Sequence, residues 1–370
     1  GLLVRAGSPA EALSHFSDLQ DRLRHELGIA PSPETAALAD RIRAGDRTGV
    51  APVVEVARPG FLDRTVTTLH PRFVDRRPQL EQLRRHLDAA IAGRGRMVFV
   101  AGEAGSGKTM LARELLRQAM AVPDLLAARG RCNAFAGVGD PYLPFRELLG
   151  QLTGEVEVGY ADGTLDRDQA TRLWDAIPHT ARLVAELGPS LVGVMVHGGL
   201  LLERLEQARP DASEPDAVHQ RIAALVARRA TTDRLQPALF DEYTTVLERL
   251  AVRHPLVLVV DDLQWADRGS IALLWHLARR LEGSRVLLVV AYRPEEVSMA
   301  RDAPFPLEAV LRELHAQTPG RVVEVGSDRA FVDALLDTEP NALDEDFRER
   351  LYASTAGHAL FTAELVRDLQ

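Results

Sequence analysis

The chain of 370 residues contains a single lysine, Lys108, within the stretch GEAGSGKT at residues 102–109. All its other long cationic side chains are arginines. An ammonium is a compact point charge on a slender stem that fits inside a tight loop, whereas the planar guanidinium is wider and directed differently. We therefore interpret Lys108 as a cation that a loop must enclose, and the neighbouring glycines as the residues that form this loop.

The stretch GEAGSGKT has the spacing GxxxxGK[ST] and lies between an apolar run, MVFVAG at 97–102, and a predicted helix. In this context glycines let backbone N–H groups curl around phosphate oxygens, and the helix N-terminus adds its partial positive charge. The hydroxyl of Thr109 can bind Mg²⁺. The strand–loop–helix context disfavours the alternative, a glycine-rich turn with an incidental lysine. The residues expected to cradle the phosphates are Gly102, Glu103, Ala104, Gly105, Ser106, Gly107, Lys108 and Thr109.

Two adjacent acids, Asp261 and Asp262, end a second apolar run, PLVLVVDD at 255–262. In phosphoryl transfer the first such acid joins the magnesium shell, here with Thr109, and the second orients or deprotonates the attacking water. An aspartate after a strand often merely starts a turn or caps a helix. The phosphate loop earlier in the chain favours the catalytic interpretation for this pair.

Arg293 ends a third apolar run, RVLLVVAYR at 285–293. If this strand lies beside the acid-bearing strand, the guanidinium of Arg293 can reach a γ-phosphate. The alternative is a solvated arginine at a strand end. Asp267 is expected to cap the next helix, and the three tryptophans are expected to pack rather than to stack on a ligand.

Beyond residue 70, short apolar runs alternate with helical stretches. Runs that are apolar on both faces predict strands of a parallel sheet covered by helices. The segment from about 140 to 235 lacks such runs, which indicates a helical insertion between two strands. The sequence therefore predicts an α/β fold, a parallel-sheet P-loop NTPase domain. The predicted strands lie within 97–102, 125–132, 255–262, 285–293 and 321–327.

The N-terminal part has a different pattern. Residues 9–27 place apolar side chains at helical spacing, and a second helix is expected to begin at Ser32, so a helical hairpin precedes the sheet. Residues 49–70 combine prolines and β-branched residues without a helical period, which is typical of an extended linker.

Composition narrows the classes of function. With a net charge of −9 the chain lacks the excess of positive charge that is typical of nucleic-acid binding. DNA contact is therefore expected only through a region outside this chain. The apolar stretch 190–202 is too short to span a bilayer and is expected to form a buried helix. The one cysteine, Cys132, is expected to be a buried thiol in a reducing cytoplasm. The start at Gly1 and the end inside a helical-looking segment indicate a piece of a longer protein.

Together these stretches resemble bacterial regulators that join a transcriptional activator domain of the antibiotic-regulatory type to a STAND-class AAA-like ATPase. The hairpin resembles the last repeats of the tetratricopeptide-like activator domain. GEAGSGKT, PLVLVVDDLQWAD and VVAYRPEE resemble the phosphate loop, the acidic strand and the arginine segment that senses the γ-phosphate. The resemblance implies an activator domain at 1–48, a linker at 49–70, an ATPase domain at 71–340 and the start of a helical lid at 341–370.

Two further segments resemble parts of these ATPases that contact adenine. RFVDRRPQLEQLRRHL resembles the entry segment FVGRE, which implies that Val74 and Arg76 contact the nucleotide, and GHALFTAELVRDL resembles a GNPLF segment. Asp75 stands where the family has glycine, and His358 and Ala359 stand where it has Asn-Pro. These departures are expected to change the geometry of base binding.

The resemblance implies a switch of a transcriptional regulator that binds ATP and Mg²⁺ and hydrolyses ATP slowly. Its implied partners are ATP and ADP, DNA through an upstream winged helix-turn-helix domain, RNA polymerase and further copies in a nucleotide-dependent oligomer, without a membrane. A catalytically inactive nucleotide-binding scaffold for protein partners is the main alternative. A P-loop kinase for a small molecule is a third, for which no substrate-binding motif is visible.

Overall fold

The computed structural model describes residues 56–64, 74, 76–134, 140–209, 216–227, 236–299, 307–317, 320–338 and 343–368, together with residue 20. The chain divides into two units, residues 1–57 and residues 58–370, and nearly all described residues belong to the second. Apart from residue 20, the helical hairpin predicted from 9 to 42 lies outside the described residues.

Part of the predicted linker, residues 58–64, belongs to the second unit. Gly60–Asp63 form the short 3-10 helix η2, which differs from the extended chain expected there. Leu62 is buried, and the ring of Phe61 lies edge-on to that of Trp174 with centroids 6.0 Å apart. These apolar side chains explain the difference, because their burial favours a docked turn over a solvated chain.

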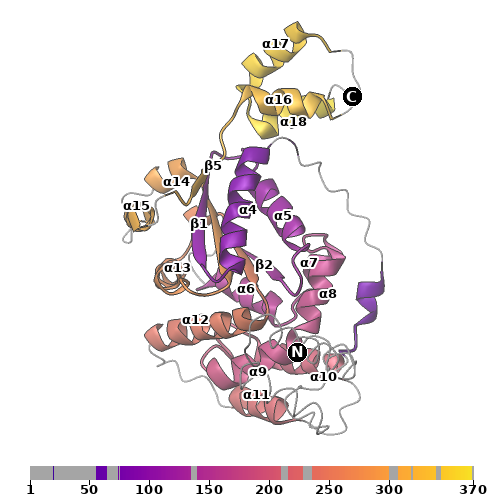
Figure 1. Cartoon of the computed structure of the whole chain (residues 1–370), viewed down its shortest axis with the longest axis vertical. Helices are drawn as coiled ribbons and strands as arrows, with labels where there is room; N and C mark the ends of the chain where they lie inside the picture. Colours follow the sequence, from indigo (N-terminus) through magenta and orange to yellow (C-terminus); the bar gives the residue numbers. More distant parts are fainter. Residues whose placement is uncertain are drawn as a thin grey trace. The chain divides into compact units, whose positions relative to one another are not determined.

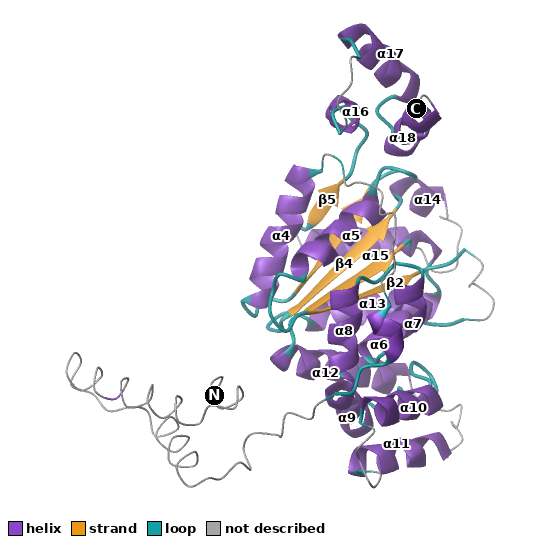
Figure 2. Ribbon diagram, turned by 90° about the vertical axis from the view of Figure 1, so that its right-hand side faces the viewer, coloured by secondary structure: helices purple, strands orange, loops and turns teal. Residues whose placement is uncertain are grey.

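A five-stranded parallel sheet is the centre of the second unit (Figures 1 and 2). The strand order is β2-β3-β4-β1-β5, and every pair in the sheet is parallel. β2 to β5 lie within predicted apolar runs, and β1 begins one residue before its run, so the predicted parallel α/β sheet is confirmed. The strands are β1 Arg96–Ala101, β2 Leu126–Arg131, β3 Leu256–Asp261, β4 Val286–Tyr292 and β5 Val322–Glu324.

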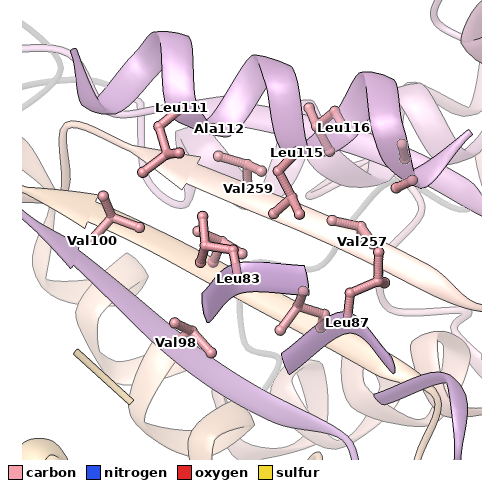
Figure 3. Close-up of a cluster of buried hydrophobic side chains, with 14 of the residues drawn as sticks. Leu83, Leu87, Val98, Val100, Leu111, Ala112, Leu115, Leu116, Val257 and Val259 are labelled. Carbon is pink, nitrogen blue, oxygen red and sulfur yellow. The ribbon is translucent and has the colours of Figure 1, made fainter. Parts of the chain in front are cut away.

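Helices α4 (Arg77–Ile91) and α5 (Lys108–Ala119) cover one face of the sheet. Figure 3 shows Leu83 and Leu87 of α4 and Leu111 and Leu115 of α5 packed against valines of the strands. Burial of these side chains contributes the main stabilisation of this layer. It also fixes the N-terminus of α5, where the GEAGSGKT loop ends.

The opposite face of the sheet is covered as well. Phe99, Leu258 and Leu288, which alternate with the residues of the first face, are also fully buried. The ring of Phe99 contacts that of His315 of α15 (Leu307–Gln317), with centroids 4.5 Å apart. Burial on both faces explains why the strands are continuous apolar runs rather than alternating ones.

Helices fill the described part of the chain between β2 and β3, which confirms the predicted insertion and extends it to residue 253. They surround a second set of buried side chains that includes Trp174 and Tyr243. These helices are α6 Leu143–Leu152, α7 Glu157–Ala161, α8 Arg167–Asp175, α9 Ile177–Leu187, α10 Gly198–Ala208, α11 Ala217–Ala227 and α12 Gln236–Arg253.

The prediction of one buried helix over 190–202 is wrong. Residues 190–197 form turns closed by a bridge between Val192 and Val196, and α10 begins only at Gly198. Gly193, with φ of +88°, lies in the left-handed region that interrupts a regular helix. The side chains of Leu191, Val192, Met195 and Val196 are buried within these turns instead.

Two side chains of α6 cover the edge strand β2. Gln151 accepts a hydrogen bond from Arg129 N at 2.9 Å and donates one to Arg129 O at 2.6 Å. Glu147 accepts a hydrogen bond from Arg131 N at 2.7 Å. The backbone groups of an edge strand otherwise lack partners in the sheet, so α6 completes β2 and holds its register. Such close packing needs glycine at position 130, where an added Cβ would lie 2.0 Å from the carbonyl oxygen of Pro144.

We expect Gly130→Ala to lower the free energy of unfolding by about 2–3 kcal/mol, because overpacking against backbone forces α6 away from β2. Gly199→Ala in α10 is the matched control, since an added Cβ there meets no atom within 4 Å. That control should leave stability unchanged or raise it by at most about 1 kcal/mol. Urea unfolding of both variants tests this, and equal midpoints would contradict the edge packing.

The C-terminal part adds short helices after β4 and β5. A small separate core of Val332, Leu336 and Leu351 joins the last of them. In the described ranges no helix is both long and apolar enough to cross a membrane. The remaining elements are η4 Leu263–Trp265, α13 Arg268–Arg280, α14 Pro294–Met299, α16 Arg329–Leu336, α17 Glu345–Thr355 and α18 Ala359–Asp368.

Candidate functional site

The GEAGSGKT loop connects the end of β1 to the start of α5, as the sequence predicts. Gly105 and Gly107 have φ values of +71° and +99°, a conformation that glycine adopts without steric cost. Glu103 and Ala104 are exposed, whereas Ser106 is fully buried. The loop therefore turns tightly and presents the free backbone N–H groups of the first turn of α5 at its mouth.

Lys108 lies inside this loop. Only 6% of the residue is exposed, and its ammonium donates hydrogen bonds to the carbonyl oxygens of Gly102 at 2.9 Å and Glu103 at 2.7 Å. Burial lowers the pKa of Lys108 below its ordinary value, and the charge of Arg293 lowers it further. A phosphate oxygen at the loop would offer this cation a charged acceptor in place of two neutral carbonyls.

Asp261, the last residue of β3, is fully buried and lies beside Thr109 of α5. The hydroxyl of Thr109 donates to Asp261 Oδ2 at 2.8 Å, and the backbone N–H of Asp262 donates to Oδ1 at 3.0 Å. A hydroxyl and a carboxylate in contact are oxygen donors of the kind that Mg²⁺ takes beside the phosphates of a substrate. These two residues therefore fit a magnesium site.

An arginine that the sequence analysis did not single out shares this carboxylate. Arg129 of β2 donates from Nη2 to Asp261 Oδ2 at 2.6 Å. The signal in the sequence is the pair Arg129 and Arg131, two charged residues at alternate positions of an otherwise small and apolar strand. Their meaning depends on the pairing of β2 with β3, which the sequence does not show.

Asp262 follows β3 in the left-handed region, with φ of +57°. Its carboxylate accepts hydrogen bonds from Arg131 Nε at 3.2 Å and Gln264 Nε2 at 3.1 Å, and Arg293 Nη2 lies 3.5 Å away. A residue other than glycine is uncommon in this conformation and concentrates at functional sites. The turn directs the second acid away from the first, so the two carboxylates face different partners.

Arg293 follows β4, which pairs with the acid-bearing strand β3 as expected. Its Nη1 contacts Glu296 Oε1 at 2.5 Å, and its guanidinium lies 5.0 Å from the ring centroid of Trp265. The ring of Trp265 thus makes a cation–π contact with a charged side chain of the site, in addition to the packing that was expected. Contact of Arg293 with a γ-phosphate stays a prediction.

The entry segment reaches the loop through Arg76, which is buried to 3% exposure. Its guanidinium donates to the carbonyl oxygen of Ser106 at 3.4 Å and pairs with Asp328 at 3.0 Å. Val74 is half-buried, and Asp75 lies outside the described residues. Arg76 therefore connects the loop to the residue that caps α16.

The C-terminal helices also contact the loop. His358 Nε2 lies 2.5 Å from the carbonyl oxygen of Ala104, and the backbone N–H of Leu360 donates to the carbonyl oxygen of Gly105 at 3.2 Å. Ala359 begins α18 and is buried. The segment that departs from Asn-Pro is thus in direct contact with the outer side of the loop.

Two other predictions concern residues next to the site. Asp267 caps α13, since its carboxylate accepts a hydrogen bond from Ser270 N at 3.0 Å. Cys132 is a buried free thiol, and burial raises its pKa well above the ordinary value. Both predictions are confirmed, and neither residue takes part in the arrangement around Lys108.

Comparisons with known proteins match the chain to two families. Residues 72–290 match the family described as AAA ATPase domain, and residues 2–43 match the family described as Bacterial transcriptional activator domain. The regulatory protein AfsR of Streptomyces griseus is 36% identical over 123 residues, which cover 32% of this chain and 12% of AfsR. An uncharacterized protein of Rhizobium meliloti (strain 1021) is 26% identical over 246 residues, which cover 65% of this chain and 20% of that protein.

Both matches thus span only a small part of the relatives' own length. Among solved structures, the ORC2 protein of Aeropyrum pernix, described in ADPNP–ADP complexes, matches with a TM-score of 0.39 and 15% identity. That match covers 83% of this chain and 64% of the other.

Proposed function

The chain belongs to the family of AAA ATPase domains and carries a bacterial transcriptional activator domain before it, and from this premise we propose that it is the nucleotide-dependent switch module of a transcriptional regulator. In this proposal ATP and Mg²⁺ bind at the GEAGSGKT loop and hold one arrangement of the helices around it. Slow hydrolysis to ADP then resets the arrangement.

The observation that carries the proposal is the enclosed Lys108 beside the contact between Thr109 and Asp261. The ammonium would exchange its bonds to loop carbonyls for bonds to the β- and γ-phosphates. Thr109 and Asp261 would hold Mg²⁺, which supplies charge neutralisation on the phosphates when bound. All three side chains are positioned by the packing of α5 on the sheet.

Asp262 and Arg293 are the residues we assign to hydrolysis. The carboxylate of Asp262 would orient a water molecule or accept its proton, and the guanidinium of Arg293 would stabilise charge on the γ-phosphate. Both side chains currently pair with each other and with neighbours, Arg131 for the acid and Glu296 for the arginine. Nucleotide binding would therefore rearrange these ion pairs.

The switch part of the proposal rests on the contacts behind the loop. His358 and Leu360 contact the carbonyl oxygens of Ala104 and Gly105, and Arg76 contacts that of Ser106. A change in loop conformation on phosphate binding would be transmitted directly to α16 and α18 through these contacts. This gives the nucleotide a physical means to bias the positions of the C-terminal helices.

The regulatory setting is supported by the activator-domain match and by the similarity to a regulatory protein. We propose that DNA is contacted through a region outside this chain, since the chain is acidic overall. RNA polymerase and further copies of the protein remain proposed partners.

The ion pairs of the two acids favour a second candidate, a nucleotide-binding scaffold without catalysis. Asp261 pairs with Arg129, and Asp262 pairs with Arg131 and Arg293. Carboxylate oxygens held in this way are occupied by guanidinium groups, so they cannot contact Mg²⁺ or a water molecule until the arginines move.

Nucleotide binding and phosphate release on the purified protein separate the two candidates. The switch predicts saturable binding of ATP and ADP, together with a phosphate release that requires Mg²⁺. Binding without turnover would favour the scaffold. Absence of ATP binding by a folded protein would refute both.

A further inference from the structure

We propose that Arg129 is an internal counter-cation that occupies the metal side of Asp261, so that Mg²⁺ can bind there only when Arg129 moves away. The inference rests on the proposed function, because it concerns the same magnesium site. It goes beyond that function by naming a residue that sets how much Mg²⁺ the site requires.

The sheet register brings this arginine to the acid. Arg131 is directly paired with Asp261, and Arg129 is paired with Val259, two residues before the acid on β3. The long side chain of Arg129 leans along the strands toward their carboxyl end and reaches Asp261 Oδ2 at 2.6 Å. Gln151 fixes the backbone of Arg129 on both its N–H and its carbonyl, so this placement does not depend on a mobile main chain.

Burial makes a counter-cation necessary at this position. The side chain of Asp261 is only 1% exposed and that of Arg129 only 15%, so a carboxylate without a cation would be strongly destabilising. Arg129 supplies the positive charge that Mg²⁺ would otherwise provide. The protein without metal is thereby charge-compensated at its deepest acid.

Arg129 contacts the carboxylate oxygen of Asp261 that a bound metal would need. Thr109 Oγ1 and Arg129 Nη2 both contact the same oxygen, Asp261 Oδ2, at 2.8 and 2.6 Å. Thr109 and Asp261 would hold a magnesium ion through their oxygens, and Arg129 now contacts one of those oxygens. A guanidinium in direct contact with that oxygen and a divalent cation there would repel each other strongly in a buried site. The two cations are therefore competitors for one carboxylate.

Two other features weaken the hold on Arg129: one of its hydrogen-bond donors is unsatisfied, and another arginine lies nearby. Within the described residues, its buried Nε has no hydrogen-bond partner. Arg113, one turn after Thr109 on α5, is close enough that the charge of Arg129, after burial, lowers the pKa of Arg113. An arginine with an unsatisfied donor and a like-charged neighbour can leave Asp261 at a smaller cost than a fully bonded one.

The test measures the Mg²⁺ dependence of binding without using hydrolysis. The fluorescence anisotropy of a labelled ATP is followed while free Mg²⁺ is varied, for the parent protein and for Arg129→Gln. We expect the half-saturating Mg²⁺ concentration to fall by about tenfold in the variant, because the competing charge is removed. Arg129→Lys keeps a positive charge but loses the planar guanidinium. This variant should lower the half-saturating Mg²⁺ concentration by about threefold.

Two further variants control for general electrostatics. Arg117→Gln removes one charge at an exposed residue of α5 that pairs with Glu114, and it should leave the half-saturating concentration unchanged. Arg131→Gln removes the neighbouring arginine of β2, which contacts Asp262 instead, and its effect should be smaller than that of Arg129→Gln. An equal effect of Arg131→Gln would overturn the direct competition.

A second measurement uses Mg²⁺ alone and the thermal unfolding midpoint. Arg129→Gln should unfold at a lower temperature than the parent in a metal chelator, and Mg²⁺ should raise its midpoint more than the parent's. If that variant does not fold, Arg129→Lys decides, and an unchanged or higher Mg²⁺ requirement in it overturns the proposal. Parent protein that fails to bind the labelled ATP would refute the proposed function, whereas the Mg²⁺ comparison would still decide the role of Arg129.

Discussion

Replacement of Lys108 by arginine is expected to weaken ATP binding by about 10- to 100-fold, since a hydrogen bond to a charged group contributes about 1.5–3 kcal/mol. The loop holds the ammonium within 2.9 Å of two carbonyl oxygens, so its inner space matches a small cation on a thin stem. A guanidinium carries the same charge but cannot take this position without opening the loop. Charge alone should therefore not restore the affinity.

The matched control for this exchange is Arg117→Lys, which swaps the same two residue types at an exposed position of the same helix. Its ATP affinity should equal that of the parent. Calorimetric titration gives both affinities, and thermal unfolding shows whether the variants are folded. Equal affinity of the parent and a folded Lys108→Arg would mean that the lysine does not contact the nucleotide.

Replacement of Asp262 by asparagine should preserve ATP binding and reduce the rate of hydrolysis by about 10²- to 10⁴-fold, the usual contribution of a general base. Asparagine tolerates the left-handed backbone of position 262 as well as aspartate does, so the turn after β3 should survive. What the variant loses is the proton acceptor. Steady-state phosphate release at saturating ATP measures the effect.

Asp267→Asn provides the control, because Asp267 lies five residues later and caps α13 without contacting the loop. Asparagine caps helices as well as aspartate does, so turnover should be unchanged. Stability should fall by about 1–3 kcal/mol, because Asp267 Oδ2 also accepts a hydrogen bond from Tyr142 N at 3.1 Å and an amide nitrogen in that place cannot accept it. If Asp262→Asn hydrolysed ATP at the parent's rate, the water-orienting role would belong to another group. If it lost ATP binding as well, the ion pairs of Asp262 with Arg131 and Arg293 would be structural.

The features that sequence predicted well are those that local patterns determine. A strand buried on both faces must be apolar throughout. The five apolar runs therefore predicted the positions of β1 to β5 to within one to a few residues. The GEAGSGKT loop was predictable because its glycines and Lys108 have meaning only between a strand and a helix. The position of Arg293 beside β3 followed from the same strand assignment, and β3 and β4 are indeed neighbours.

The features that sequence did not predict depend on which strands are neighbours. Arg129 and Arg131 belong to an edge strand, where charged side chains ordinarily contact solvent. Only the pairing of β2 with β3 turns them toward Asp261 and Asp262. The prediction of a buried helix over 190–202 was wrong for a different reason. Hydropathy alone does not distinguish a helix from buried turns, and the positive φ of Gly193 favours the turns.

A crystal structure of the protein with a non-hydrolysable ATP analogue and Mg²⁺ tests the central claim most directly. We expect the β- and γ-phosphates of the analogue within the loop at 102–109, with Lys108 Nζ in hydrogen-bond contact with their oxygens rather than with the carbonyls of Gly102 and Glu103. An analogue bound away from this loop would contradict the assignment of this site. So would a Lys108 that still contacts the carbonyl oxygens of Gly102 and Glu103 when the analogue is at saturating concentration.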